Sequence, residues 1–199
     1  MTKADRPTAD RPGGFFLDYH DSKIGPKTVT TLIREEPELK RIGRKKMEKA
    51  INRPLEDRLK EIGITIEALV ETGLEMYITD PEIGSGDEVG SLLRKEILSA
   101  LKDINICSLI IAGIKLEDEG RRGLIPGLSE EEYQKDPVHL IADEILGIQI
   151  ATYIAGTRAL FEFERFDRKK PGILNKLPPI LDDVIGGLIS GCLVKTCSR

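Results

Sequence analysis

The sequence has few aromatic residues, histidines and cysteines. It contains no tryptophan, two histidines and three cysteines, and aromatic residues occupy 5% of its 199 positions while charged residues occupy 32%. Such a composition is typical of a helical, soluble protein. Cys107, Cys192 and Cys197 lack the spacing of zinc ligands, so zinc is not expected. The three thiols are predicted to be reduced, in or near the core of a cytoplasmic protein.

A basic excess and a long apolar run are also missing. The net charge is −4, so the chain offers no positive field for nucleic acid. Its longest apolar stretch, residues 104–114, is shorter than the ~20 residues that a membrane span requires, and polar residues interrupt it. Residues 1–14 are polar and proline-rich, unlike a secretory signal. We therefore expect neither a transmembrane segment nor a nucleic-acid partner.

Composition divides the chain into three parts. Residues 1–26 combine Pro, Gly and Asp with little periodicity, and we interpret them as a mobile N-terminal arm. Residues 27–60 form a charged helical extension, with eleven Lys or Arg against six Asp or Glu. This extension could contact an anionic membrane surface, or its mixed charges could be solvated or packed. Residues 61–199 are predicted to form the compact helical domain.

Helix-start signals and apolar periodicity predict an all-α fold, a compact orthogonal or bundle-like domain. Thr65 is placed to cap the first helix, and Ser129 with Glu132 forms a capping-box pattern. No strand-like alternation competes with this interpretation. The predicted helices cover residues 66–78, 88–101, 104–116 as a central helix, a short helix after Ser129, 138–161 and 180–195.

Acidic residues recur in the otherwise apolar last sixty residues. They are the pairs Asp143–Glu144 and Asp182–Asp183, with Asp167 between them, shortly before Lys170–Pro171. A carboxylate on a helix face that packs into a core is costly unless a metal, a cation or a hydrogen-bond network compensates it. The three positions therefore predict a site for a hard cation, assembled from two helices and a loop.

Glycines accompany both acidic pairs. Gly147 lies one turn after Asp143, and Gly186–Gly187 follow Asp182–Asp183, so helices can approach closely around a small ligand. Ligation by oxygen alone suits Mg²⁺ or Mn²⁺. Each pair taken singly could instead be a helix cap or a solvated stripe. The three positions together favour the metal site.

The segments ADEILGIQIA (142–151), FERFDRKKPGIL (163–174) and LPPILDDVIGGLISG (177–191) carry a D-E pair, a D-x-x-K-P element and a D-D pair in order. This pattern resembles the phosphatidylglycerophosphatase A family. The segment LIIAGIKLE (109–117) resembles its soluble members, in which an acidic residue occupies the Glu117 position. The resemblance extends from about residue 63 to the C-terminus and implies an all-α, Mg²⁺-dependent phosphomonoesterase.

The resemblance also implies roles for individual residues. The metal ligands would be Asp143, Glu144, Asp167, Asp182 and Asp183, and the catalytic residues Glu117, Glu144, Asp167 and Lys170. Lys170 would neutralise phosphate charge, although a lysine in this basic run could also be solvated. Glu117 or Glu144 could orient the attacking water as general base. Arg121 and Arg122 could grip the substrate or lie in a solvated loop.

Two substrates follow from two branches of the family. Its name-giving members act on a lipid head group and carry membrane spans, which this sequence lacks. Residues 119–174 resemble the soluble branch, the archaeal CobZ-type α-ribazole phosphatases, which implies α-ribazole 5′-phosphate and cobalamin biosynthesis. Phosphatidylglycerophosphate, in phospholipid biosynthesis, is the alternative. A non-catalytic interaction protein on the same scaffold is the second alternative, and a homodimer is compatible with the apolar last helix.

Overall fold

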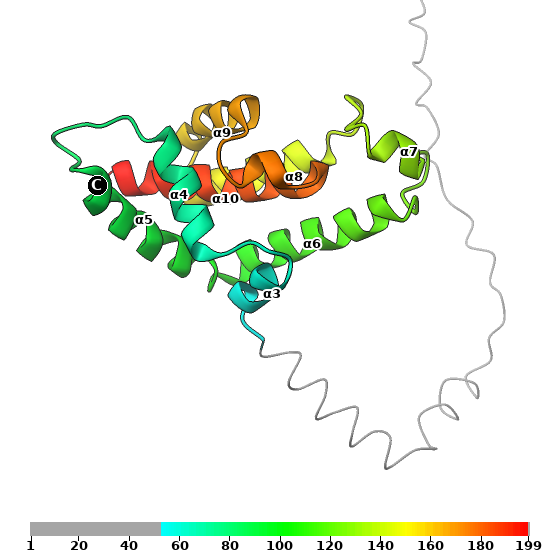
Figure 1. The fold of residues 1–199 in the computed structure, drawn as a ribbon, viewed down its shortest axis with the longest axis horizontal. Helices are drawn as coiled ribbons and strands as arrows, with labels where there is room; N and C mark the ends of the chain where they lie inside the picture. Colours follow the sequence, from blue (N-terminus) through cyan, green and yellow to red (C-terminus); the bar gives the residue numbers. More distant parts are fainter. Residues whose placement is uncertain (1–52, 199) are drawn as a thin grey trace, which may run out of the picture. The chain divides into compact units, whose positions relative to one another are not determined.

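This computed structural model describes residues 53–198, which contain eight α-helices and one 3-10 turn joined by loops (Figure 1). No strand occurs among these residues, and one isolated bridge joins Asp80 to Gly84. The predicted all-α class is therefore confirmed. In chain order the elements are α3 (Leu55–Glu61), α4 (Ile66–Met76), α5 (Gly86–Ala100), α6 (Ile104–Arg121), α7 (Glu130–Tyr133), α8 (Ala142–Ala155), α9 (Arg158–Lys169), η1 (Leu174–Lys176) and α10 (Pro179–Cys197).

Side-chain caps begin several of these helices where the sequence signals lie. The Thr65 hydroxyl accepts a backbone N–H of the first turn of α4, as predicted. A capping box between Ser129 and Glu132 begins α7, also as predicted. A second box, between Ser85 and Glu88, begins α5 two residues before the expected start. Local hydrogen-bonding chemistry therefore sets these helix starts.

The predicted single helix over residues 138–161 is wrong. The chain forms two helices there, because Gly156 adopts a φ of 71° that ends α8, and α9 begins at Arg158. The start is also later, at Ala142. The second helix continues to Lys169, so Asp167 lies in a helical last turn and not in the expected loop.

The central helix is α10, and the prediction that residues 104–116 take this place is wrong. Nearly every residue of α10 from Ile180 to Leu193 is buried, and α4, α5, α6, α8 and α9 all pack on it (Figure 1). By contrast, α6 buries one face, and Ile104 on another face is 78% exposed. α6 also runs on to Arg121, five residues beyond its predicted end.

Glycines allow α8 and α10 to cross in backbone contact. A Cβ atom on Gly187 would lie 2.2 Å from the Gly147 carbonyl oxygen, and one on Gly147 would lie 2.5 Å from the Asp183 carbonyl oxygen. Asp143 precedes Gly147 by one helical turn, and Asp183 precedes Gly187 by one turn. The crossing therefore brings the two acidic pairs to the same end of the helix pair.

The helix α3 joins the same core as the later helices. It contributes Leu55 and Leu59, although it spans the predicted boundary at residue 60. The predicted arm, residues 1–26, and most of the predicted extension lie outside the described residues. All three thiols are free, with Cys192 buried and the other two partly buried.

A helix that crosses a membrane must be both long enough and apolar enough, and no single helix among residues 53–198 meets both requirements. The consecutive helices α5 and α6 meet them only as a pair, and the chain bends by 83° between them.

Candidate functional site

Three carboxylates converge where the N-terminal ends of α8 and α10 meet. One oxygen from each of Asp143, Glu144 and Asp183 lies within 4.8 Å of the others. Asp143 is 2% exposed and Asp183 4% exposed, so neither carboxylate is solvated like a surface group. The backbone N–H of Glu144 donates to Asp143 Oδ1 over 3.0 Å and helps to fix that carboxylate. The structure thus brings together three of the five predicted metal ligands.

The other two predicted ligands gather around Lys170. The ammonium group lies 2.8 Å from Asp167 Oδ1, 2.8 Å from Asp182 Oδ2 and 3.2 Å from Asp183 Oδ1. Lys170 ends α9 in the left-handed conformation, with a φ of 43°, which directs the chain out of the helix. Asp183 therefore belongs to both groups, facing the three-carboxylate cluster and the lysine.

Three of the carboxylates at this site, those of Asp143, Asp182 and Asp183, hold their protons more tightly than ordinary ones. Burial, and next the contact with Glu144, raises the pKa of Asp143 to about 8. Burial raises the pKa of Asp183 to about 7 and that of Asp182 to about 6, with the Lys170 charge opposing both shifts. Desolvation and crowding of like charges act in the same direction. A cation that binds here would favour the ionised forms.

The pKa of Lys170 is also raised, but neighbouring charges and not burial are the cause. Burial by itself lowers its pKa, but the hydrogen bonds that Lys170 donates to Asp167 and Asp182, together with the Asp183 charge, outweigh burial and raise it. The ammonium group therefore stays protonated across the neutral range. A permanent positive charge lies beside the carboxylate cluster.

Two carboxylate oxygens at this site are buried with no hydrogen-bond partner among the described residues. They are Glu144 Oε2 and Asp182 Oδ1. A buried oxygen of this kind is costly unless a ligand satisfies it. An all-oxygen set of carboxylates suits a hard divalent cation such as Mg²⁺ or Mn²⁺. The residues present thus fit a metal ion of this class.

Glu117, predicted as catalytic, lies outside the three-carboxylate cluster. Its Oε1 accepts from Arg121 Nε over 2.6 Å, and its Oε2 accepts from the backbone N–H of Ile180 over 3.3 Å. Arg121 is the last residue of α6 and pairs with Glu117, whereas the sequence predicted that Arg121 lies in a loop. The i, i+4 spacing of the pair was the signal that could have revealed it. The catalytic role of Glu117 stays a prediction.

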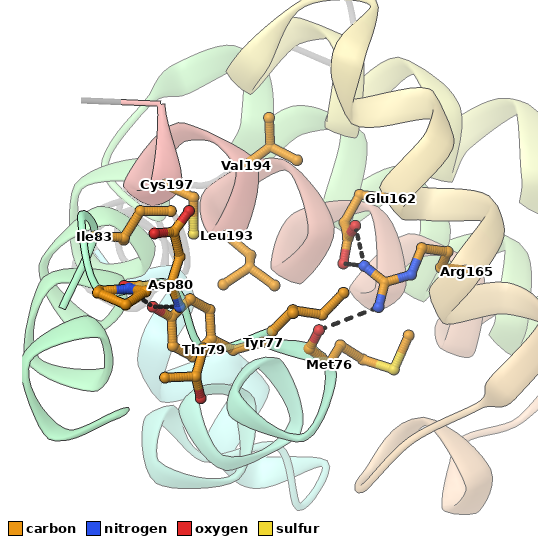
Figure 2. Close-up of a pocket in the computed structure, with 12 residues that line it drawn as sticks. Met76, Tyr77, Thr79, Asp80, Ile83, Glu162, Arg165, Leu193, Val194 and Cys197 are labelled. Atoms are coloured by element: carbon orange, nitrogen blue, oxygen red, sulfur yellow. Dashed lines mark hydrogen bonds and ion pairs between the residues drawn. The ribbon is translucent and has the colours of Figure 1, made fainter. Parts of the chain in front are cut away.

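A cavity of about 340 Å³ opens at the other end of α10 (Figure 2). Leu193, Val194 and Cys197 line it, together with α9 and the segment that follows α4. Arg165 is held there by Glu162 and by the Met76 carbonyl. Leu193 follows Asp183 by ten residues, or about 15 Å along the helix. None of the predicted site residues is among the described residues that line this cavity.

Comparisons with known proteins identify the family. The family model named Phosphatidylglycerophosphatase A matches residues 124–198. The uncharacterised protein MJ1330 of Methanocaldococcus jannaschii is 38% identical over 130 residues, which cover 63% of this chain and 98% of that protein. The chain belongs to the phosphatidylglycerophosphatase A family. The predicted resemblance is therefore confirmed, and the matched residues include all five predicted ligands and Lys170, but not Glu117.

Solved structures share the fold of this phosphatidylglycerophosphatase A-like chain. The low temperature requirement C protein from Listeria monocytogenes is similar with a TM-score of 0.61 and 22% identity, covering 70% of this chain and 90% of that chain. A protein of unknown function from Bacillus stearothermophilus is similar with a TM-score of 0.62 and 20% identity, covering 72% of this chain and 96% of that chain. At these identities the likeness shows the fold alone. Membership of a phosphatase family supports a phosphatase-type activity for this chain.

Proposed function

We propose that this chain is a phosphomonoesterase that depends on Mg²⁺ or Mn²⁺. The observation that carries the proposal is the convergence of Asp143, Glu144 and Asp183 beside the Lys170 ammonium group. Buried carboxylates that crowd together favour a cation, and a fixed lysine beside them favours an anion such as phosphate. A site that takes both ions at once is suited to a phosphate ester bound through a metal.

The three converging carboxylates would hold the metal, and Asp182, whose Oδ1 is buried without a hydrogen-bond partner among the described residues, would support it. When bound, the ion supplies Lewis-acid polarisation of the phosphoryl oxygens and lowers the pKa of a water molecule. Glu144 Oε2 has no hydrogen-bond partner among the described residues, so it can accept the proton of an attacking water. Glu144 thus combines the roles of ligand and general base.

Lys170 would bind the phosphoryl group as a point charge. Its ammonium group is already held by Asp167 and Asp182, so little side-chain freedom is lost when phosphate binds. Asp167 therefore acts through Lys170 in this proposal, because its carboxylate orients and charges the lysine. In this assignment Asp143 and Glu144 serve the metal alone, Asp167 serves the lysine alone, and Asp182 and Asp183 serve both.

We propose α-ribazole 5′-phosphate as the substrate, a small phosphorylated molecule of cobalamin biosynthesis. Support comes from the resemblance of residues 119–174 to the CobZ-type phosphatases. Phosphatidylglycerophosphate is the alternative that the family name carries. The two substrates share a phosphomonoester and differ in the alcohol, which the carboxylates and Lys170 do not contact in the proposed mechanism.

Release of phosphate from p-nitrophenyl phosphate tests the reaction class. The full chain should be active with Mg²⁺ or Mn²⁺ and inactive with EDTA, and Asp183→Asn should reduce the rate about 100-fold or more. Glu164→Gln, the same change at an exposed carboxylate of α9, is the matched control and should keep the wild-type rate. An inactive wild type that also binds no Mn²⁺ would instead support a non-catalytic interaction protein.

A comparison of two esters tests the substrate. The full chain should hydrolyse α-ribazole 5′-phosphate with a higher kcat/KM than phosphatidylglycerophosphate dispersed in detergent. The reverse order would reject the α-ribazole assignment and leave the metal-dependent phosphatase intact. Equal turnover of both esters and of p-nitrophenyl phosphate would likewise reject a preference for α-ribazole.

A further inference from the structure

The first turn of α10 lacks the usual means of capping. Pro178 is its N-cap and Pro179 its first helical residue, and neither has a side-chain oxygen that could accept an N–H. Proline also has no N–H of its own, so Ile180 carries the first N–H of the helix. Ile180 is fully buried. Its N–H therefore needs a partner from the protein, since water does not reach it.

Glu117 of α6 supplies that partner. Its Oε2 accepts the Ile180 N–H over 3.3 Å, although the two residues are 63 positions apart. Its Oε1 is held by Arg121 Nε over 2.6 Å, which fixes the carboxylate in this orientation. A negative charge at a helix N-terminus is also favoured by the helix dipole. The carboxylate thus does for α10 what an N-cap side chain does for other helices.

Glu117 is buried next to Tyr133. Tyr133 is buried beside it, and burial together with the Glu117 contact raises the pKa of the tyrosine, although its hydroxyl makes no hydrogen bond of good geometry with the described residues. The ring lies against Gly120, where a Cβ atom would be 2.5 Å from it. Glu117 itself is 4% exposed. Tyr133 thus contributes to the burial of the Glu117 carboxylate.

A second close contact between α6 and α10 lies one turn further along. A Cβ atom on Gly113 would lie 2.7 Å from Val184 Cγ2, so the helices touch there with no room for a side chain. In α10 the two contacts, at Ile180 and Val184, flank Asp182 and Asp183. The turn that carries both acids is therefore fixed from both sides by α6.

We propose that Glu117 is a positioning residue, which caps α10 from α6 and thereby sets the position of Asp182 and Asp183. This role differs from a general base or a metal ligand, because Glu117 acts through the backbone of α10. The effect on phosphate release rests on the proposed function. The capping contact and its effect on metal affinity can be measured without any turnover.

The conservative variant Glu117→Gln separates positioning from catalysis. Its amide oxygen can still accept the Ile180 N–H, and the largely exposed Arg121 can turn to water. We expect this variant to keep phosphatase activity and Mn²⁺ affinity within about threefold, with an unchanged pH profile. Loss of a general base or of an ionised ligand would instead cost about 100-fold or more. Such a loss in Glu117→Gln, with Ile180 protection intact, would overturn the proposal.

Glu117→Ala removes the acceptor. We expect the Ile180 amide, followed by NMR hydrogen exchange, to lose protection about 10-fold or more, and the Mn²⁺ affinity to fall about 10-fold. An Ile180 amide that exchanges as in the wild type would overturn the proposal, as would an unchanged Mn²⁺ affinity. If Glu117→Ala does not fold, Arg121→Ala tests the same contact from its exposed side, with the same readouts and smaller expected changes.

Ser85→Ala is the matched control for loss of a cap. It removes the N-cap side chain of α5, so it should lower stability while leaving the Mn²⁺ affinity and the Ile180 amide unchanged. A similar fall of Mn²⁺ affinity in this variant would show that general destabilisation, and not positioning, explains Glu117→Ala. If the wild type released no phosphate from any ester, the proposed function would fail, and the amide and Mn²⁺ measurements would still decide this inference.

Discussion

The two ends of α10 bury different kinds of side chain. Near its C-terminus, Leu193 and Val194 line a cavity, and the Arg165–Glu162 ion pair, with side chains 43% and 14% exposed, belongs to the same lining (Figure 2). Near its N-terminus, Asp182 and Asp183 are buried among further charges. Packing alone would favour apolar residues at both ends, because buried charge is costly. The difference supports placing the proposed phosphatase site at the N-terminal end of α10.

The glycines of α10 offer the strongest test of this contrast. Gly187→Ala should lower the free energy of unfolding by about 3 kcal/mol, because the new Cβ would meet the Gly147 carbonyl oxygen at 2.2 Å. Gly186→Ala is the matched control, since its nearest neighbour would be Leu174 Cδ1 at 3.5 Å, an ordinary contact. Urea denaturation measures the free energy of unfolding of both variants. Equal losses would show that the backbone contact between α8 and α10 does not set the stability of the crossing.

This pair of glycines also shows what the sequence could and could not predict. The occurrence of glycine beside acidic pairs predicted a close helix crossing, since a missing side chain is a local property. Which of Gly186 and Gly187 touches α8 depends on the rotation of α10 in the folded chain. The break at Gly156 was missed for a related reason, because a glycine within an apolar helical pattern is compatible with a continuous helix.

The sequence likewise predicted some contacts of the acidic residues and could not predict others. Their order and their helical setting predicted that Asp143, Glu144 and Asp183 would meet, because burying charges on consecutive apolar helices requires a shared compensation. The pairing of Asp167 and Asp182 with Lys170 needed the left-handed end of α9, which a lysine rarely adopts. The contact of Glu117 with the Ile180 N–H joins a side chain to a backbone group, so residue types carry no signal for it.

Lys170→Met should have the next largest effect. The variant keeps the length of the side chain and removes the charge, so kcat/KM for p-nitrophenyl phosphate should fall about 100-fold. Lys169→Met is the matched control at the adjacent, exposed lysine and should stay within about twofold of the wild type. A steady-state assay with saturating Mg²⁺ measures both. Equal behaviour of the two variants would assign Lys170 to the stability of the acidic end only.

The pH dependence of stability should also differ between metal-free and metal-bound protein. The pKa of Asp143 is raised from 3.8 to about 8, and that of Asp183 to about 7, with burial as the main cause of both shifts. The folded state therefore binds protons more tightly than the unfolded state, and metal-free stability should fall as the pH rises from about 4 to about 8. Stability contributed by these protonated groups is fully present below pH 4.

Metal should reverse this loss, because it binds the ionised carboxylates. With Mg²⁺ or Mn²⁺ at one fixed concentration, about 100 times its Kd at pH 8, the gain at pH 8 is about 2.7 kcal/mol, or a rise in Tm of about 5–10 °C. The rise should be larger at pH 8 than at pH 5, where protons compete with the metal. Thermal denaturation in EDTA and in Mn²⁺ at both pH values measures it, with Asp143→Asn as the variant that should lose the response. A rise of equal size at both pH values would contradict metal binding at these carboxylates.

The smallest effect is expected at the C-terminal end. Cys197→Ser changes a partly buried thiol that lines the cavity, and burial, followed by the charges of Glu162 and Asp80, raises the pKa of this thiol and so reduces its reactivity at neutral pH. Because the cavity lies about 15 Å or more from Asp183 along α10, kcat/KM and Mn²⁺ affinity should stay within about twofold of the wild type. A tenfold fall in either quantity would mean that the apolar end takes part in substrate binding or metal binding. In that case the contrast between the ends of α10 would reflect two parts of one site, one for the phosphate and one for the alcohol.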